Sequence, residues 1–179
     1  NLALYGQIDL PLTDRLKVIA GLRLENFQAD YSDTEDFYAT PEENLSGGKL
    51  GLEYQLDKSR MIYGLVSRGY KAGGFNANNE VPEDRREFKA ETLWNYEAGI
   101  KGRFLEGKLQ ASVSVFYQDR KDIQAKQYFA IQDLSISSGT SFVDFIDNAA
   151  SGSNTGMETE LILKVNNELS LFTSLGLLR

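Results

Sequence analysis

The segment from Lys71 to Glu87 contains the residues best suited to bind a ligand. Its cationic and amide side chains supply N–H donors for an anionic, oxygen-rich ligand, and an aromatic ring can stack on a flat one. Three nearby glycines permit a tight backbone path. The candidate ligand-binding residues are Arg68, Tyr70, Lys71, Phe75, Asn76, Arg85 and Arg86, with Asn78 and Asn79 beside them. The alternative interpretation is an ordinary hydrated loop with a charged tip.

A second group of polar side chains lies in the acidic stretch 30–36, which reads Asp-Tyr-Ser-Asp-Thr-Glu-Asp. Carboxylates at this density could hold calcium, which prefers hard oxygen ligands. The stretch lacks the spacing and the glycine of an EF-hand loop, so a solvated, self-repelling loop is the favoured interpretation. The sequence therefore predicts no metal site and no cofactor.

Composition excludes several classes of chemistry. The 179 residues include no histidine and no cysteine, which removes Ser-His and Cys-His nucleophiles, histidine metal sites and disulfides. The acidic residues form no recognisable acid/base pair, so we predict no enzyme. A net charge of -7 argues against a nucleic-acid partner. Charge-free runs reach only about ten residues, too short for a membrane-spanning helix.

Apolar and polar residues alternate with a period of two along most of the chain. Leu16, Val18, Ala20, Leu22 and Leu24 would share one face of a strand, and the same pattern recurs from Leu109 to Tyr117. Strict alternation over such lengths predicts β-strands rather than helices. We expect about eight strands, near 2–10, 16–28, 46–56, 60–70, 91–104, 108–120, 153–165 and 168–179.

The connections between these strands alternate between short and long. Short turns fall at 11–15, 57–59, 105–107 and 166–167, and long loops at 29–45, 71–90 and 121–152. Short turns at one end and long loops at the other are typical of an outer-membrane β-barrel. Between Trp94 and Phe104, about ten residues at about 3.3 Å each, tilted by about 40°, rise about 25 Å, the height of a lipid-facing band. A soluble sheet with surface aromatics is the alternative.

The third long loop is too apolar for a plain flexible connection, and we expect strand extensions near 127–131 and 141–147. The strands also carry charges on the face opposite their apolar residues. On a soluble sheet this face would meet water, and in a barrel it would line a wet or protein-filled lumen. The residues assigned to this face are Arg23, Glu97, Lys101, Arg103, Glu158 and Glu160.

Several stretches resemble the barrel of TonB-dependent outer-membrane receptors, in that family's order. The clearest is Tyr63-Gly-Leu-Val-Ser-Arg-Gly-Tyr-Lys-Ala-Gly-Gly-Phe-Asn76. It is followed by Ala90-Glu-Thr-Leu-Trp-Asn-Tyr-Glu-Ala-Gly-Ile-Lys-Gly102, and then by Val113-Ser-Val-Phe-Tyr-Gln-Asp-Arg-Lys-Asp-Ile-Gln124. Asn148-Ala-Ala-Ser-Gly with Gly156-Met-Glu-Thr-Glu160, and Ala3-Leu-Tyr-Gly-Gln-Ile-Asp with Ala20-Gly-Leu-Arg23, complete the likeness.

The resemblance implies an all-β, antiparallel up-and-down barrel of about 22 strands, closed by an N-terminal plug domain. Such receptors bind scarce, large nutrients, most commonly ferric siderophores, and import them with energy from the inner-membrane TonB complex. The implied partners are outer-membrane lipid, the protein's own plug domain, the TonB complex and a ferric siderophore or similar ligand, since cobalamin, haem and oligosaccharides are also taken up by such receptors. The six charged residues of the polar face would then face the plug.

Residues 1–179 would form part of the barrel domain only. The sequence shows no signal peptide, no plug, no TonB-contacting segment and no closing aromatic-terminated strand, so we expect an internal fragment. The alternatives are another outer-membrane barrel, either a porin or a small adhesion or structural barrel, and a soluble β-rich binding module.

Overall fold

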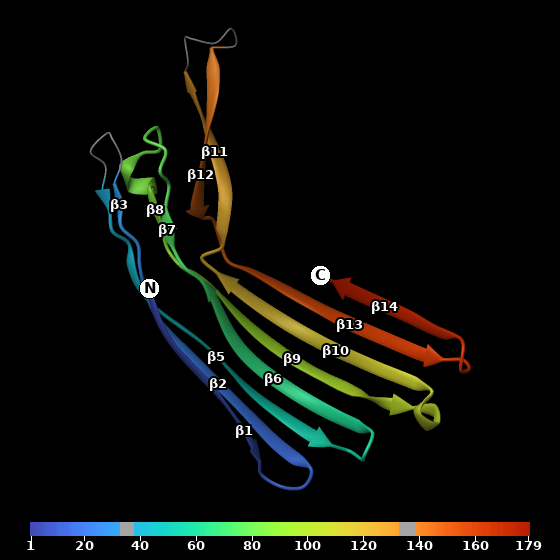
Figure 1. Ribbon diagram of the computed structural model, residues 1–179. Helices are drawn as coiled ribbons and strands as arrows, with labels where there is room; N and C mark the ends of the chain where they lie inside the picture. The colour runs from blue at the N-terminus through green and yellow to red at the C-terminus, as the bar shows by residue number, and fades with distance from the viewer. Residues whose placement is uncertain (33–37, 133–138) are drawn as a thin grey trace.

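A curved antiparallel sheet forms the body of the molecule in this computed structural model, which describes residues 1–32, 38–132 and 139–179 (Figure 1). Its eight strands lie side by side in chain order, each antiparallel to the next. This arrangement confirms the predicted fold class. The strands are β1 (Leu2–Pro11), β2 (Leu16–Gln28), β5 (Glu42–Gln55), β6 (Arg60–Lys71), β9 (Glu91–Phe104), β10 (Leu109–Lys121), β13 (Gly152–Lys164) and β14 (Ser170–Leu178).

The largest difference from the predicted strands is at the start of β5. This strand begins at Glu42, whereas the sequence predicts a start near residue 46. The added residues read Glu-Glu-Asn-Leu, and Glu and Asn are poor strand formers. These residues form a strand because β2 is long enough to pair with them, for example Gln28 with Glu42 and Asn26 with Asn44. Here pairing with a neighbour overrides local propensity.

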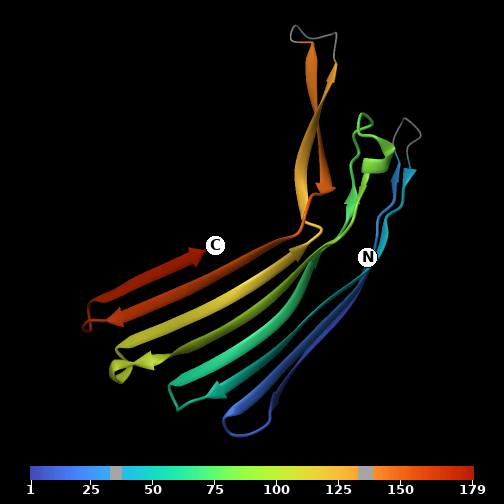
Figure 2. The same ribbon diagram turned by 180° about the vertical axis from the view of Figure 1, so that it is seen from behind.

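The long connections carry smaller ladders that rise together from one end of the sheet, which we call the long-loop end (Figures 1 and 2). The hairpin of β11 (Gln124–Gln132) and β12 (Thr140–Asn148) confirms the predicted strand extensions. The other two long loops contain strands of only two residues each. These are too short to show an alternation of apolar and polar residues, and they were not predicted. They are β3 (Tyr31–Ser32) with β4 (Tyr38–Ala39), and β7 (Gly74–Phe75) with β8 (Glu87–Phe88), beside the 3₁₀ turn η1 (Glu83–Arg85).

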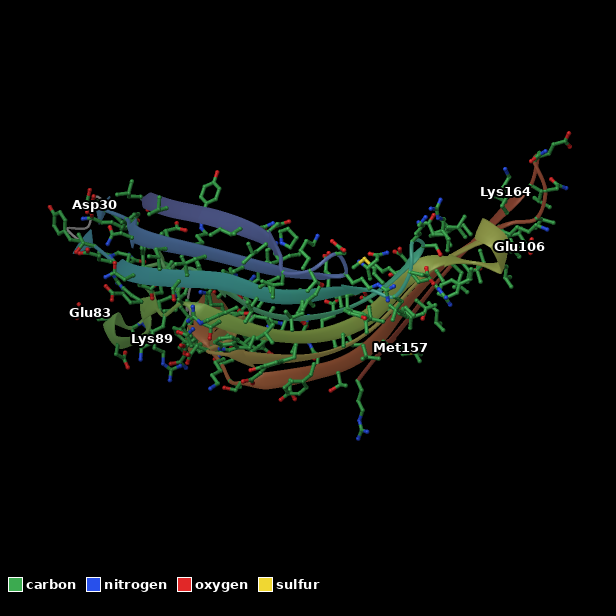
Figure 3. All side chains as sticks on the ribbon, turned by 90° about the horizontal axis from the view of Figure 1, so that it is seen from below. Asp30, Glu83, Lys89, Glu106, Met157 and Lys164 are labelled. Carbon is green, nitrogen blue, oxygen red and sulfur yellow. The ribbon has the colours of Figure 1, made fainter. Side chains whose placement is uncertain are left out.

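The opposite end, the short-turn end, is closed by tight turns. Figure 3 shows Glu106 and Lys164 at this end, and Asp30, Glu83 and Lys89 at the other. In the turn between β5 and β6, the Asp57 carboxylate accepts a hydrogen bond from Arg60 Nε at 2.6 Å and from the Ser59 N–H at 2.8 Å. These bonds, the one from Arg60 foremost, hold the pKa of Asp57 well below its usual range.

Between β9 and β10 the 3₁₀ turn η2 (Leu105–Gly107) uses left-handed backbone at Leu105 and Glu106. The two 3₁₀ turns are single turns of three residues each. No helix in the described ranges is long and apolar enough to cross a membrane.

The strand register gathers apolar side chains on one face of the sheet, which we call the apolar face. Val66 pairs with both Leu50 and Tyr96, and Tyr96 pairs with Tyr117. These side chains are not covered by the chain itself, since Leu50 is 57% exposed and Tyr96 is 46% exposed. Exposing such a continuous apolar surface to water would be costly, so this face requires apolar surroundings.

The buried hydrophobic cluster lies in the loops rather than on the apolar face. Val81 and Val143 are each 1% exposed and Phe145 is 4% exposed, and Phe129 and Ile131 pack against them. Val81 comes from the loop between β6 and β9, and the other residues come from β11 and β12. The two loops therefore share one small core at the long-loop end.

On the opposite face, which we call the polar face, aromatic rings cover glycines of the next strand. The Tyr63 ring lies over Gly99, where an added Cβ would come 2.7 Å from the ring and 2.7 Å from the Val113 carbonyl oxygen. Phe116 covers Gly156 in the same way. Gly64, on the apolar face, has nothing within 4 Å of an added Cβ.

These contacts predict effects of different size for two Gly→Ala substitutions. Gly99→Ala should lower the free energy of unfolding by about 1–3 kcal/mol, because the methyl group overpacks a site backed by main chain. Gly64→Ala should change it by less than about 1 kcal/mol, because the methyl group enters open space and alanine loses less backbone entropy. Unfolding of both variants in lipid bilayers checks this, and equal effects would contradict it.

Candidate functional site

The predicted ligand-binding residues all lie at or near the long-loop end. Arg68, Tyr70 and Lys71 occupy the last residues of β6, and Phe75 belongs to β7. Asn76, Arg85 and Arg86 follow in the segment that contains η1. Glu83 and Lys89 mark this segment in Figure 3. The structure thus places these residues in one region, and their individual contacts separate them into different roles.

Asn76 joins two loops. Its amide nitrogen donates to the Ile146 carbonyl at 2.8 Å, and its amide oxygen accepts from the Ile146 N–H at 2.8 Å. The same nitrogen also reaches the Arg85 carbonyl at 3.1 Å. This reciprocal pair fixes the loop between β6 and β9 against β12, so most of the hydrogen-bonding capacity of Asn76 is used within the protein.

Arg86 folds its own loop. Its Nε donates to the Val81 carbonyl at 3.0 Å and its Nη2 to the Asn79 carbonyl at 2.9 Å. Arg85, one residue earlier, lies with its guanidinium over the Phe145 ring at 5.7 Å from the centroid. Within the described ranges, the Arg85 guanidinium has no hydrogen bond or ion pair. Arg85 therefore keeps N–H donors that a ligand could use.

Phe75 is an internal contact rather than an open stacking surface. Its ring centroid lies 4.6 Å from that of Tyr31, with the planes tilted by 42°. Because Tyr31 belongs to β3, this contact ties the first long loop to the second.

Arg68 and Tyr70 also bind within the sheet. Arg68 donates to the carbonyl and, at 3.1 Å, to the hydroxyl of Ser46. The Tyr70 hydroxyl donates to Glu25 Oε2 at 2.7 Å and accepts from Arg23 Nε at 2.9 Å. The Tyr70 ring reaches β2 by crossing Gly47, where an added Cβ would lie 3.2 Å from the ring.

Lys71 and Arg85 are thus the predicted ligand-binding cations with the most freedom to meet a ligand. Lys71 is exposed, and its ammonium group has no hydrogen bond or ion pair in the part of the chain that the structure describes. The other candidates spend their donors or their ring surface on the protein. Their assignment as ligand contacts stays a prediction.

Sequence reasoning missed the polar residues that organise this end. Glu91 is only 8% exposed, and it accepts from Arg120 Nε at 2.9 Å and from the Gln124 N–H at 3.0 Å. Glu43, Gln124 and Asn148 bind main-chain groups of the loop between β6 and β9. Glu91, Gln124 and Asn148 stand in stretches that resemble the family and Glu43 does not, but neither the resemblance nor the alternation of residues assigns any of the four a binding partner.

The six charged residues predicted to line a lumen do share the polar face. Glu97 accepts from the Tyr63 hydroxyl at 2.6 Å, and the Lys101 ammonium lies 4.9 Å from the centroid of the same ring. Arg23 pairs with Glu25 at 2.7 Å. In contrast, the structure shows no hydrogen bond or ion pair of the Glu158 or Glu160 side chain with any residue it describes.

The calcium hypothesis concerns residues that lie largely outside the described ranges. Asp33, Glu35 and Asp36 are not described, whereas Asp30 is. Among the residues that are described, no group of three or more acidic side chains is placed to hold a metal ion.

Comparison with known proteins gives the class of this chain. A family profile described as TonB dependent receptor-like, beta-barrel, matches residues 1–178. The pesticin receptor of Yersinia pestis is 29% identical over 171 residues, which is 89% of this chain and 23% of that protein. The ferric-pyoverdine BN7/BN8 receptor of Pseudomonas putida is 32% identical over 144 residues, 74% of this chain and 17% of that protein.

Solved structures show the same fold. The ferric yersiniabactin uptake receptor FyuA from Yersinia pestis superposes with a TM-score of 0.75 at 24% identity, covering 99% of this chain and 26% of that one. The copper transporter OprC superposes with a TM-score of 0.70 at 15% identity, covering 98% of this chain and 28% of that one.

The chain therefore belongs to the TonB-dependent receptor family and forms part of an outer-membrane β-barrel. It spans only 17% to 28% of the length of the relatives reported above. The family is one of receptors rather than enzymes, in agreement with the expectation from the sequence. In such barrels the long loops are extracellular, so the candidate ligand site lies outside the cell and the short turns are periplasmic.

Proposed function

We propose that this chain is part of a receptor that takes up a scarce, large nutrient, namely a ferric siderophore, by energy-coupled import. The observation that carries the proposal is the family match over residues 1–178. Two relatives at 28% and 32% identity are ferric-pyoverdine receptors. The exposed cations at the extracellular end suit a ligand with anionic oxygen groups.

In this proposal the chain supplies the extracellular binding surface and the barrel wall. Lys71 and Arg85 attract the ligand, and the apolar face contacts outer-membrane lipid. A plug domain elsewhere in the protein fills the lumen, and the TonB complex acts on that plug. Residues 1–179 are then a partial barrel domain.

Iron uptake tests the proposal in the intact receptor. A strain that lacks the receptor and the same strain complemented with the gene would be given a panel of ⁵⁵Fe-loaded siderophores, with ferric pyoverdines included. We expect uptake of at least one of them that requires the gene and stops when the proton-motive force is collapsed. Gene-independent uptake across the panel would overturn the proposal.

Glu158 and Glu160 provide the sharpest test of the plug contact. Reversible polar contacts between the polar face and a plug would be worth about 0–1 kcal/mol each, weak enough for a pulled plug to move past them. Breaking the contacts that hold the resting plug should let it move more readily, so Glu158→Lys with Glu160→Lys should speed ferric siderophore uptake roughly two- to fivefold, with ligand affinity unchanged. The matched control is Glu106→Lys with Glu168→Lys, two exposed carboxylates in periplasmic turns. Uptake equal to wild type in both pairs would count against the contact.

A further inference from the structure

The loop between β6 and β9 leaves the sheet through residues 72–73, the outgoing leg, and returns through residues 89–90, the returning leg. These two legs do not pair with each other through main-chain hydrogen bonds. Lys71 pairs with Glu91 at the end of the β6–β9 ladder, and Gly74 pairs with Phe88 in the β7–β8 ladder above it. Residues 72–73 and 89–90 between these ladders are not strand. Unpaired main-chain groups need other partners, because leaving them unsatisfied is costly.

Glu43 of β5 binds both legs from one side. Its Oε2 accepts from the Gly73 N–H at 2.8 Å, and its Oε1 accepts from the Ala90 N–H at 2.9 Å. One carboxylate thus bridges the outgoing and the returning leg. Gly73 is buried, and an added Cβ there would lie 2.9 and 3.0 Å from the two carboxylate oxygens. A glycine at 73 is what allows the carboxylate to sit this close.

Gln124 of β11 binds both legs from the other side. Its amide nitrogen donates to the Ala72 carbonyl at 2.8 Å and to the Lys89 carbonyl at 3.1 Å. Its own N–H donates to Glu91 at 3.0 Å, which fixes the residue in place. Asn148 adds to this side, since it accepts from the Lys89 N–H at 2.6 Å and donates to the Lys89 carbonyl at 3.0 Å.

The chemistry of the two sides is complementary. Glu43 offers only acceptors and meets two N–H donors, whereas the Gln124 amide nitrogen offers donors and meets two carbonyl oxygens. The isosteric exchange at either position would place like against like. Glutamine at 43 would set an NH₂ group against one of the two N–H groups, and glutamate at 124 would set a carboxylate against both carbonyls. The two contacts therefore depend on hydrogen-bonding chemistry and not on side-chain size.

We propose that Glu43 and Gln124 are positioning residues for ligand recognition, which clamp the two legs of the 72–90 loop from opposite sides. The clamp joins this loop to β5 and to the β11–β12 hairpin, so Lys71 and Arg85 are held in one arrangement before a ligand arrives. Binding then costs less ordering of the loop, and affinity rises for that reason. The inference rests on the proposed function, since it concerns the presentation of the same extracellular surface.

Hydrogen exchange on the full-length receptor tests the clamp without any ligand. Glu43→Gln should speed amide exchange about tenfold or more at whichever of Gly73 and Ala90 faces the new NH₂ group, because its charge-assisted bond is lost and a donor faces a donor. Gln124→Glu should also speed amide exchange in the two legs, because it removes the contacts on the side of β11. The matched controls are Glu42→Gln, next to Glu43 on β5, and Gln132→Glu, at the far end of β11, and both residues are exposed. Exchange unchanged in both clamp variants would overturn the proposal.

Ligand binding then separates positioning from a purely structural role. With ⁵⁵Fe-loaded pyoverdine as the probe, Glu43→Gln should raise the apparent Kd and the KM of uptake about tenfold, with the saturated uptake rate unchanged. Faster exchange with an unchanged Kd would overturn the positioning role and leave the proposed function intact. If the wild-type receptor binds no ferric siderophore, the proposed function fails, and exchange at Gly73 and Ala90 still decides whether the clamp exists.

Discussion

Neutralising Lys71 and Arg85 together is expected to weaken the binding of a ferric siderophore about 100-fold. Both are exposed cations at the extracellular end, and the structure shows no ion pair for either among the residues it describes. A hydrogen bond to a charged group contributes about 1.5–3 kcal/mol, so two such bonds to a ligand are worth about 3 kcal/mol or more. Every 1.4 kcal/mol corresponds to about a tenfold change in Kd.

The charge of the rest of the chain makes these two cations more important. The net charge of the 179 residues is -7, so an anionic ligand gains no general attraction from this part of the receptor. Local donors must supply the attraction. Binding should accordingly weaken with rising ionic strength in the wild type, and less so in the double variant.

Lys71→Gln with Arg85→Gln removes both charges and keeps a polar side chain at each position. Glutamine at 71 also avoids placing a second carboxylate beside Glu91, which pairs with Lys71 in the ladder. The matched control is Lys58→Gln with Lys108→Gln, exposed lysines at the periplasmic end that change the net charge equally. Titration of the purified receptor with ferric pyoverdine measures the Kd. Equal weakening by both pairs would show that only overall charge matters.

The strands of this fold can be predicted from sequence because period-two alternation has a direct physical cause. One face of each strand meets apolar surroundings, so a residue such as Val115 must alternate with polar ones, and pairing with neighbours keeps the faces aligned. The hairpin β11–β12 was predicted for a similar reason, since Phe129, Phe142 and Phe145 are too apolar for a solvated loop. The prediction was wrong at 42–45, where the extended strand depends on its partner β2 and on no property of Glu-Glu-Asn-Leu.

The sequence is enough to locate the candidate site but not to assign a role to each of its residues. Their positions in the sequence place Asn76, Arg85 and Arg86 in one loop, yet only the structure shows that Asn76 binds Ile146 and that Arg86 binds its own loop. Glu43 and Gln124 lie far from the loop in sequence, and their partners are main-chain groups that any residue carries. A single sequence has no signal for a side chain whose role depends on main-chain geometry 30 or 52 residues away.

The two faces of the sheet lead to the second large prediction: an arginine introduced on the apolar face of β10 should be destabilising, whereas an arginine introduced on the polar face of the same strand should be tolerated. Val115 lies near the middle of β10 on the apolar face, between Ala98 and Met157 of the adjacent strands, and is 53% exposed. Val115→Arg would place a charge on the lipid-facing surface near the bilayer midplane. That position costs about 2–4 kcal/mol in outer-membrane barrels.

Ser112→Arg is the matched control because it adds the same side chain to the other face of the same strand. Ser112 pairs with Lys101 on one side and with Glu160 on the other, so an arginine there meets the polar face and has a carboxylate within one strand. We expect its effect on the free energy of unfolding to stay within about 1 kcal/mol.

Unfolding of the full-length receptor in lipid bilayers measures both free energies, and heat-modifiable mobility on gels reports how much folded receptor reaches the outer membrane. Val115→Arg should lower both quantities, whereas Ser112→Arg should leave both near wild type. If both variants were tolerated equally, the apolar face would not be in contact with lipid. If both were equally harmful, the polar face would be packed too tightly for a lumen wall. The assignment of lipid to one face and lumen to the other therefore depends on the difference between these two variants and not on either alone.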